Sequence, residues 1–230
     1  MAVVPTDAHC HIGGIGADFP AAVCAINPEQ WRGLSAADNP EIKKVFGLFL
    51  GEALQHSDAD IDAAMDVLAP YLRDASAVGE FGLDKRFAPV LPFYRQEKIF
   101  DAHVRLALET HKPCVLHCVG AWGFLLRKMR IAAKSGVGKF LLHSASCPPD
   151  LSRDFAKLGA YFSFSPRTLR SRNGAETAAL APAEKILLES DDTPDAQIYA
   201  AALAKLADLR NISESEMSEI VEENFHAFYL

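Results

Sequence analysis

The amino-acid sequence predicts an α/β fold, a (β/α)8 barrel of the TIM type, from three observations. Short apolar runs of strand length recur eight times along the chain. Segments with helical spacing of apolar residues separate most of these runs, and this alternation is typical of a parallel sheet. The chain has 230 residues, close to the roughly 250 that an eight-unit barrel needs.

The predicted strands are almost continuously apolar, as expected for parallel strands that are buried on both faces. They cover residues 2–8, 21–26, 44–49, 77–81, 113–117, 139–143, 160–164 and 185–189. Helices are predicted at residues 58–73, 95–110, 122–133, 149–158, 193–209 and 213–225. The first two connections are short and rich in glycine, proline and asparagine. We therefore expect trimmed or missing helices in the first units.

Composition predicts one domain over residues 1–230. Half of the residues are hydrophobic, which is enough to fill a core, and no internal linker divides the chain. The net charge of −7 argues against a non-specific nucleic-acid coat, because such coats depend on basic surface. It does not exclude a nuclease, since a bound metal can supply positive charge locally.

The sequence also predicts a cytoplasmic protein. Its five cysteines are odd in number and form no C-x-x-C pair, so a disulfide framework is not expected. We see no signal peptide, and no run of about 18 apolar residues that could span a membrane. Nothing in the sequence indicates an obligate protein partner.

Candidate metal ligands begin at the end of the first predicted strand. Side chains alternate in a strand, so Asp7, His9 and His11 share one face while Ala8 and Cys10 point away. Two imidazoles at this spacing can bind one divalent ion. Taken alone, the pair could equally be two incidental histidines at a strand end.

Other strands also end on an ionisable residue. These residues are Glu80, His117, His143 and Asp191. The carboxyl ends of barrel strands form the active-site face, so we expect these four side chains to meet His9 and His11 there, six candidate ligands in all. Their nitrogen and oxygen atoms suit one or two divalent ions, Zn, Mn or Mg.

Three arginines follow the seventh predicted strand: Arg167, Arg170 and Arg172. Loops after the last strands of a barrel often bind phosphate, so we hypothesise that one of them binds an anionic group of the substrate. Plain surface charge is the alternative. Glu189 has the strand parity of Asp191, and it either orients a ligand or makes a structural hydrogen bond.

These motifs resemble those of the TatD family of metal-dependent hydrolases, within the amidohydrolase-like barrels. The matching segments are Asp7-Ala8-His9-Cys10-His11, Val78-Gly79-Glu80-Phe81-Gly82-Leu83-Asp84, Leu116-His117, Leu142-His143, Leu187-Leu188-Glu189-Ser190-Asp191 and Asn224-Phe225-His226-Ala227-Phe228. The resemblance implies that Glu80 bridges two metals. It also implies that His9, His11 and Asp191 hold one metal, and that His117 and His143 hold the other.

Three loops depart from the family pattern. The loop after the third strand, Phe49-Leu50-Gly51-Glu52, lacks the histidine common in the family. The segments Cys118-Val119-Gly120-Ala121 and Ser144-Ala145-Ser146-Cys147-Pro148-Pro149 also differ. The metal ligands therefore match the family, whereas the residues expected around the substrate do not.

The ligand set and the resemblance predict a metal-dependent hydrolase that cleaves phosphodiesters, like a TatD deoxyribonuclease or exonuclease. Its substrate would be a single-stranded nucleic acid or a small molecule. Asp191 is the candidate general base, because a carboxylate within reach of the nucleophilic water can accept its proton. Glu80 is the second residue expected in catalysis.

Two alternatives remain open. An amidohydrolase or lactonase acting on a small molecule is the first, although many such barrels carry a metal-bridging lysine where Glu80 stands. The second is a metal-binding barrel without catalysis, and the presence of Asp191 argues against it.

Overall fold

The computed structural model describes residues 6–13, 19–54, 57–192 and 196–230. Within this part of the chain, eight parallel strands pair in consecutive order from β1 to β8. The ends of the sheet meet where Cys10 bridges Asp191. The N–H of Asp191 donates to the carbonyl of His9 at 3.0 Å, and the N–H of His11 donates to the carbonyl of Asp191 at 3.3 Å. The result is a nearly closed barrel, as the sequence predicted.

All eight predicted strands are present in the described residues, although residues 2–5 of the first lie outside them. The strands are β1 (Asp7–Cys10), β2 (Ala21–Ala25), β3 (Ile42–Phe46), β4 (Ala77–Asp84), β5 (Cys114–Val119), β6 (Phe140–Leu142), β7 (Ala160–Phe164) and β8 (Ile186–Leu188). β3 begins two residues before its predicted start, because the half-buried Lys43 and Lys44 do not interrupt the strand. β4 extends to Asp84, beyond the predicted end.

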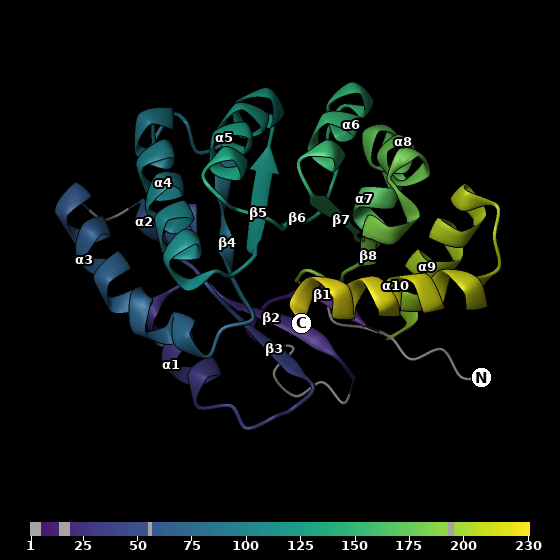
Figure 1. The fold of residues 1–230 in the computed structure, drawn as a ribbon, viewed down its shortest axis with the longest axis horizontal. Helices are drawn as coiled ribbons and strands as arrows, with labels where there is room; N and C mark the ends of the chain where they lie inside the picture. The colour runs from purple at the N-terminus through teal and green to yellow at the C-terminus, as the bar shows by residue number, and fades with distance from the viewer. Residues whose placement is uncertain (1–5, 14–18, 55–56, 193–195) are drawn as a thin grey trace.

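Helices surround the strands, from α1 and α3 in blue to α9 and α10 in yellow (Figure 1). They are α1 (Pro28–Ser35), α2 (Leu50–Ala53), α3 (Asp58–Leu68), α4 (Phe93–Thr110), α5 (Trp122–Lys134), α6 (Pro149–Lys157), α7 (Pro166–Arg170), α8 (Arg172–Leu180), α9 (Ala196–Arg210) and α10 (Glu214–Tyr229). The second connection holds α1, of only 8 residues. The helix predicted at 58–73 changes to a 3-10 turn at Ala69–Arg73, where Pro70 has no N–H to donate.

Capping side chains lie at the starts of two of the predicted helices. The hydroxyl of Ser57 accepts a hydrogen bond from the N–H of Asp60 at the start of α3. Ser213 caps α10 through the N–H of Glu216 in the same way. Each such cap satisfies an N–H that the helix itself leaves unpaired. The short helices α7, of 5 residues, and α8, of 9 residues, were not predicted, because so few residues give a weak periodic signal.

The barrel interior below the strand ends is filled by a separate apolar cluster. It contains Val115 and Leu141, which precede His117 and His143 by two residues and so share their strand face. Phe228 and Tyr229 of α10 close this cluster, and the hydroxyl of Tyr229 donates to the carbonyl of Ala8 at 2.6 Å. One end of the barrel is therefore packed with side chains. The polar residues gather at the other end.

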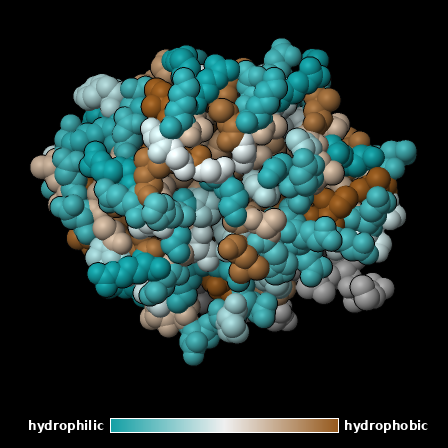
Figure 2. Space-filling view, in the orientation of Figure 1, coloured by the Kyte–Doolittle hydropathy of each residue, from teal (hydrophilic) through white to brown (hydrophobic). Residues whose placement is uncertain are grey.

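Hydrophilic residues cover most of the face shown in Figure 2, with smaller apolar areas between them. All five cysteines are buried and carry free thiols. No helix in the described ranges combines the length and the apolar character needed to cross a membrane.

Gly82 holds β4 and β5 in close contact, which gives a stability prediction. A Cβ at this position would lie 1.8 Å from the carbonyl oxygen of His117. We expect Gly82→Ala to destabilise the protein by at least the roughly 1–3 kcal/mol typical of overpacking. Thermal unfolding measures the loss. The control is Gly33→Ala in α1, where a Cβ meets nothing within 4 Å, and equal melting temperatures for the two variants would contradict the close approach.

Candidate metal centre

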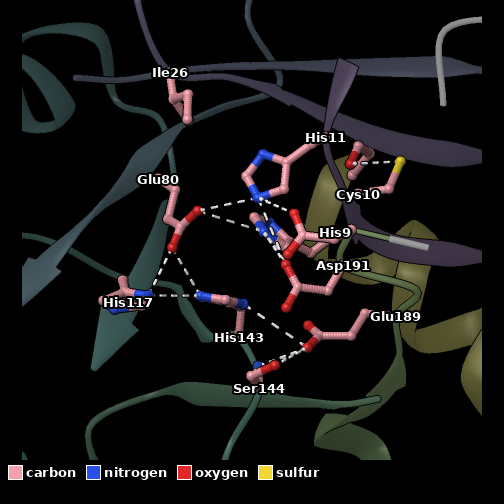
Figure 3. A network of polar contacts seen from close by, with 12 residues as sticks. His9, Cys10, His11, Ile26, Glu80, His117, His143, Ser144, Glu189 and Asp191 are labelled. Carbon is pink, nitrogen blue, oxygen red and sulfur yellow. Dashed lines mark hydrogen bonds and ion pairs between the residues drawn. The ribbon is translucent and has the colours of Figure 1, made fainter. Parts of the chain in front are cut away.

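The structure brings all six predicted ligand side chains together at the carboxyl ends of the strands (Figure 3). His9, Glu80, His117 and His143 are buried, while His11 and Asp191 are half-buried. They belong to overlapping groups whose nitrogen and oxygen atoms lie within 4.8 Å of one another. The carboxyl ends of the parallel strands all lie on one side of the barrel. Residues that are far apart in the sequence therefore lie together in one cluster.

Glu80 lies between two pairs of imidazoles. Its Oε1 is 2.7 Å from Nδ1 of His117 and 2.8 Å from Nε2 of His143. Its Oε2 is 3.6 Å from Nε2 of His9 and 3.7 Å from Nε2 of His11. Figure 3 shows the carboxylate between the two pairs. Two groups of potential ligands therefore share one carboxylate.

Asp191 approaches this cluster from the end of β8. Its Oδ1 lies 3.5 Å from Nε2 of His11 and 3.8 Å from Nε2 of His9, and its side chain is 30% exposed. Its backbone has φ 57°, a left-handed conformation that aspartate and asparagine adopt more readily than most residues. The backbone hydrogen bonds to β1 fix this turn. Asp191 is thus both joined to the cluster and accessible from outside.

The donor set fits a divalent metal. Among the described residues, the buried Nε2 of His9 has no hydrogen-bond partner, and such an unpaired polar atom costs about 1–3 kcal/mol. An ion held by His9, His11 and Glu80 would satisfy it. Imidazole and carboxylate ligands together suit zinc or manganese.

The charges of the cluster are strongly coupled. Burial alone would raise the pKa of Glu80, but His143 and His117 hold that pKa well below its usual range. Burial alone would lower the pKa of His143, but Glu80 and Glu189 raise it well above the usual value. Burial, and then the neighbouring His143, lower the pKa of His9 to about 4. Without metal, the proton charge therefore resides near His143 rather than at His9.

Asp84 orients His117, a role that the sequence reasoning missed. Nε2 of His117 donates to Oδ2 of Asp84 at 2.9 Å, which directs Nδ1 toward Glu80. The backbone of Asp84 is fixed by the buried Gln96, which accepts from its N–H at 2.8 Å and donates to its carbonyl at 3.0 Å. The sequence did contain a signal for this role. Asp84 lies four residues after Glu80 on the same strand, so the two side chains share one face of β4.

Glu189 serves mainly to hold loops. It accepts hydrogen bonds from the N–H and hydroxyl of Ser144 at 2.8 and 2.6 Å, and from the hydroxyl of Ser163. Its Oε1 is 3.8 Å from Nδ1 of His143, a longer contact. Of the two roles considered from sequence, the structural hydrogen bond is the one with the shorter contacts.

A cavity of about 270 Å³ opens beside the cluster, lined by His117, His143 and Asp191 among others. Arg167 borders this cavity, and Arg170 borders an adjoining one of about 160 Å³. Arg172 borders neither: its side chain is 88% exposed and pairs with Glu176 at 2.8 Å. The structure therefore brings Arg167 to the cluster, places Arg170 next to it, and separates Arg172 from it.

Arg86 also borders the larger cavity, and the sequence reasoning did not single it out. It lies in the turn that follows β4, two residues after Asp84. A lone arginine in a turn has no periodicity that could distinguish it from surface charge.

Comparison with known proteins identifies a family and several similar sequences. The family described as TatD related DNase matches residues 6–230. The human protein "Deoxyribonuclease TATDN3" is 25% identical over 177 residues, 72% of this chain and 64% of the human protein. The "3'-5' ssDNA/RNA exonuclease TatD" of Edwardsiella piscicida is 33% identical over 131 residues, 54% of this chain and 49% of that protein.

Two solved structures have the same fold. The crystal structure of the TatD homologue YJJV from Escherichia coli aligns with a TM-score of 0.83 and 20% identity, over 100% of this chain and 99% of that one. A TatD family hydrolase from Entamoeba histolytica aligns with a TM-score of 0.79 and 13% identity, over 100% and 99% of the two chains. The chain spans 64% and 59% of the human and mouse TATDN3 proteins. With a family match over residues 6–230, the chain belongs to the TatD related DNase family.

Proposed function

We propose that this protein is a metal-dependent hydrolase that cleaves phosphodiester bonds in single-stranded nucleic acid. The observation that carries the proposal is the pair of imidazole groups sharing Glu80 beside a cavity that Arg167 borders. The printed names of the relatives, a deoxyribonuclease and an exonuclease acting on single-stranded DNA and RNA, support the substrate class.

The centre would hold one or two divalent ions, Zn, Mn or Mg. His9, His11 and Asp191 are the proposed ligands of one ion, His117 and His143 those of the other, and Glu80 is common to both. When bound, such an ion acts as a Lewis acid and lowers the pKa of water at the centre. The shared position of Glu80, with one oxygen toward each pair of imidazoles, supports two ions.

Asp191 is the proposed general base. Its side chain borders the cavity, whereas Glu80 is buried among the imidazoles. Burial would raise its pKa, but the hydrogen bond from His11 and the nearby His9 lower that pKa to about 2. The carboxylate is therefore ionised at neutral pH and can accept the proton of the attacking water. Arg167, which borders the cavity, would bind an anionic group of the substrate by a charge-assisted hydrogen bond.

Loss of the carboxylate that orients His117 should weaken metal binding. We expect Asp84→Asn to lower metal affinity by about tenfold to a hundredfold, the usual effect of removing such a partner. Competition with a chromophoric chelator measures the affinity. Asp154→Asn is the matched control, because Asp154 pairs with Arg130 at 2.7 Å on the surface. Equal affinities in the two variants would remove Asp84 from this role.

The experiment that tests the proposed function combines elemental analysis with a hydrolysis screen. The purified protein is assayed on bis-p-nitrophenyl phosphate and on a single-stranded oligonucleotide, with Zn, Mn or Mg supplied separately and with a chelator. Bound metal with chelator-sensitive cleavage of both esters supports the proposal. Bound metal with hydrolysis of amides or lactones alone would replace it by the amidohydrolase alternative. A metal-free protein after exposure to all three ions would overturn it.

A further inference from the structure

The cavity beside the metal centre differs in charge from the chain as a whole. The chain carries −7, yet the described residues that line this cavity include two arginines, Arg86 and Arg167, and one carboxylate, Asp191. Four hydroxyl side chains complete its polar lining: Ser144, Ser146, Thr168 and Ser171. The hydroxyls of Ser144 and Ser171 already donate to Glu189 and to the carbonyl of Thr168, so the guanidinium groups supply the donors for phosphate oxygens. The cavity therefore has the chemistry of an anion site.

Arg86 is already held in place for such a site. Its Nε lies 3.0 Å from Oδ2 of Asp84, and its Nη2 lies 2.6 Å from the same oxygen. Among the described residues, its Nη1 has no hydrogen-bond partner, and its side chain is 61% exposed. Asp84 thus fixes the guanidinium plane while one nitrogen stays available. A donor ordered before binding loses less entropy when a ligand arrives.

Arg167 supplies the second guanidinium. It lies in α7, directly after β7, and borders both the larger cavity and the adjoining one. Within the described part of the chain, its side chain makes no hydrogen bond or ion pair. By contrast, Arg130 and Arg172 are each paired with a carboxylate. Arg167 is a positive charge without a partner, placed next to the metal centre.

We propose that Arg86 and Arg167 form a clamp for a second phosphate group, next to the phosphate that lies at the metal centre. The inference rests on the proposed function and deepens it, because it names the substrate class as a nucleotide or strand with two successive phosphates. A phosphate at the metal centre would have the bound ions and their imidazole ligands as partners. The cavity of about 270 Å³ is larger than one phosphate group and carries both guanidiniums, so a second anion has space and countercharge there.

Apart from the two arginines, part of the cavity wall belongs to segments that differ from the family pattern. Cys118 and Val119, as well as Ser144 and Ser146, line the cavity, and they lie in the loops that depart from the family pattern.

The test measures binding to the metal-loaded protein by calorimetry, with thymidine 3′,5′-bisphosphate and thymidine 5′-monophosphate as probes. We expect the wild type to prefer the bisphosphate. Arg86→Gln and Arg167→Gln should each reduce the ratio of the two affinities by about tenfold to a hundredfold, the range for hydrogen bonds to charged groups. Arg86→Lys keeps the positive charge but loses the planar guanidinium with its several donors. Its affinity ratio should therefore lie between those of Arg86→Gln and the wild type.

Arg130→Gln is the matched control, since Arg130 is also an arginine paired with an aspartate, Asp154, and lies outside the cavity lining. Its ratio should equal that of the wild type. Metal content is measured for every variant. If Arg86→Gln loses metal and weakens both probes equally, Arg86 acts only through Asp84 and His117, and the clamp is wrong.

The outcomes also separate this inference from the proposed function. A wild type that cleaves oligonucleotides but binds both probes equally would retain the function and overturn the clamp. A wild type that prefers the bisphosphate, with the preference lost in both glutamine variants, would support the clamp even if no phosphodiester were cleaved.

Discussion

Replacing Asp191 with asparagine is expected to lower kcat for a single-stranded oligonucleotide by about two to four powers of ten, the range for loss of a general base. The amide cannot accept the proton of the attacking water. Metal should remain bound, because His9, His11 and Glu80 still form a group with their ligand atoms within 4.8 Å. Steady-state kinetics beside elemental analysis of the variant measure both effects.

The backbone makes asparagine the informative substitution at this position. Asp191 has φ 57°, and asparagine tolerates this left-handed conformation better than alanine does. Asp191→Ala would combine lost chemistry with backbone strain in the segment after β8 that pairs with β1. Asp191→Asn therefore separates catalysis from folding.

A neighbouring carboxylate provides the control. Asp192 lies 3.7 Å from Nε2 of His11, but its side chain is 83% exposed. Asp192→Asn should cause a much smaller loss of kcat, since solvent screens an exposed charge. If both variants retained nearly the wild-type rate, Asp191 would not be the base. If Asp191→Asn lost its metal, the role of Asp191 as a ligand would by itself account for the lost rate, and the assignment as general base would be dropped.

The sequence was sufficient to predict the barrel because both of its signals are local. Apolar runs identify the strands, and a strand that ends on an ionisable residue places that residue at the carboxyl end of the barrel. Parallel strands in register then bring His117 and His143 together without any information about loops. For this reason the ligand cluster could be anticipated one strand at a time.

Loop residues followed no such rule. Arg86 lies in the turn after β4 and Arg172 is the first residue of α8, and nothing in the sequence distinguishes the arginine that borders the cavity from the one that pairs with Glu176. Their positions depend on the turn after β4 and on the short helices α7 and α8, whose lengths give too few residues for a periodic signal. The residues that border the cavity on the substrate side of the metal centre could therefore be identified only from the structure.

Metal should stabilise the protein more at pH 8 than at pH 6. Bound metal requires unprotonated imidazoles, but the pKa of His143 is raised well above 6.5 by Glu80 and Glu189, against the effect of burial. The pKa of His117 is also raised, by Asp84 and Glu80. Each proton displaced costs about 1.4 kcal/mol per pH unit below the pKa of its imidazole.

The metal-free protein has the opposite dependence on pH. A folded-state pKa above the unfolded value gives stability that is complete below the unfolded pKa of about 6.5. This contribution is lost as pH rises through the folded pKa of His143. The paired Glu80, whose pKa is lowered, contributes above its unfolded value of about 4.5 and loses that contribution only in acid. Raising the pH from 6 to 8 therefore weakens the metal-free fold while it strengthens metal binding.

Thermal unfolding at pH 6, 7 and 8, with saturating zinc or with a chelator, measures both trends. Metal at a hundred times its Kd adds about 2.7 kcal/mol, which for a chain of this size raises the Tm by roughly 5–10 °C. We expect this metal-induced rise in Tm near pH 8, and we expect most of it to be lost at pH 6. His143→Gln should reduce the increment at every pH and flatten its pH dependence, because the variant lacks both a ligand and the proton that the metal displaces. An increment that is equal at pH 6 and pH 8 would mean that no proton leaves His143 or His117 when metal binds, and the two imidazoles beside Glu80 would then not be its ligands.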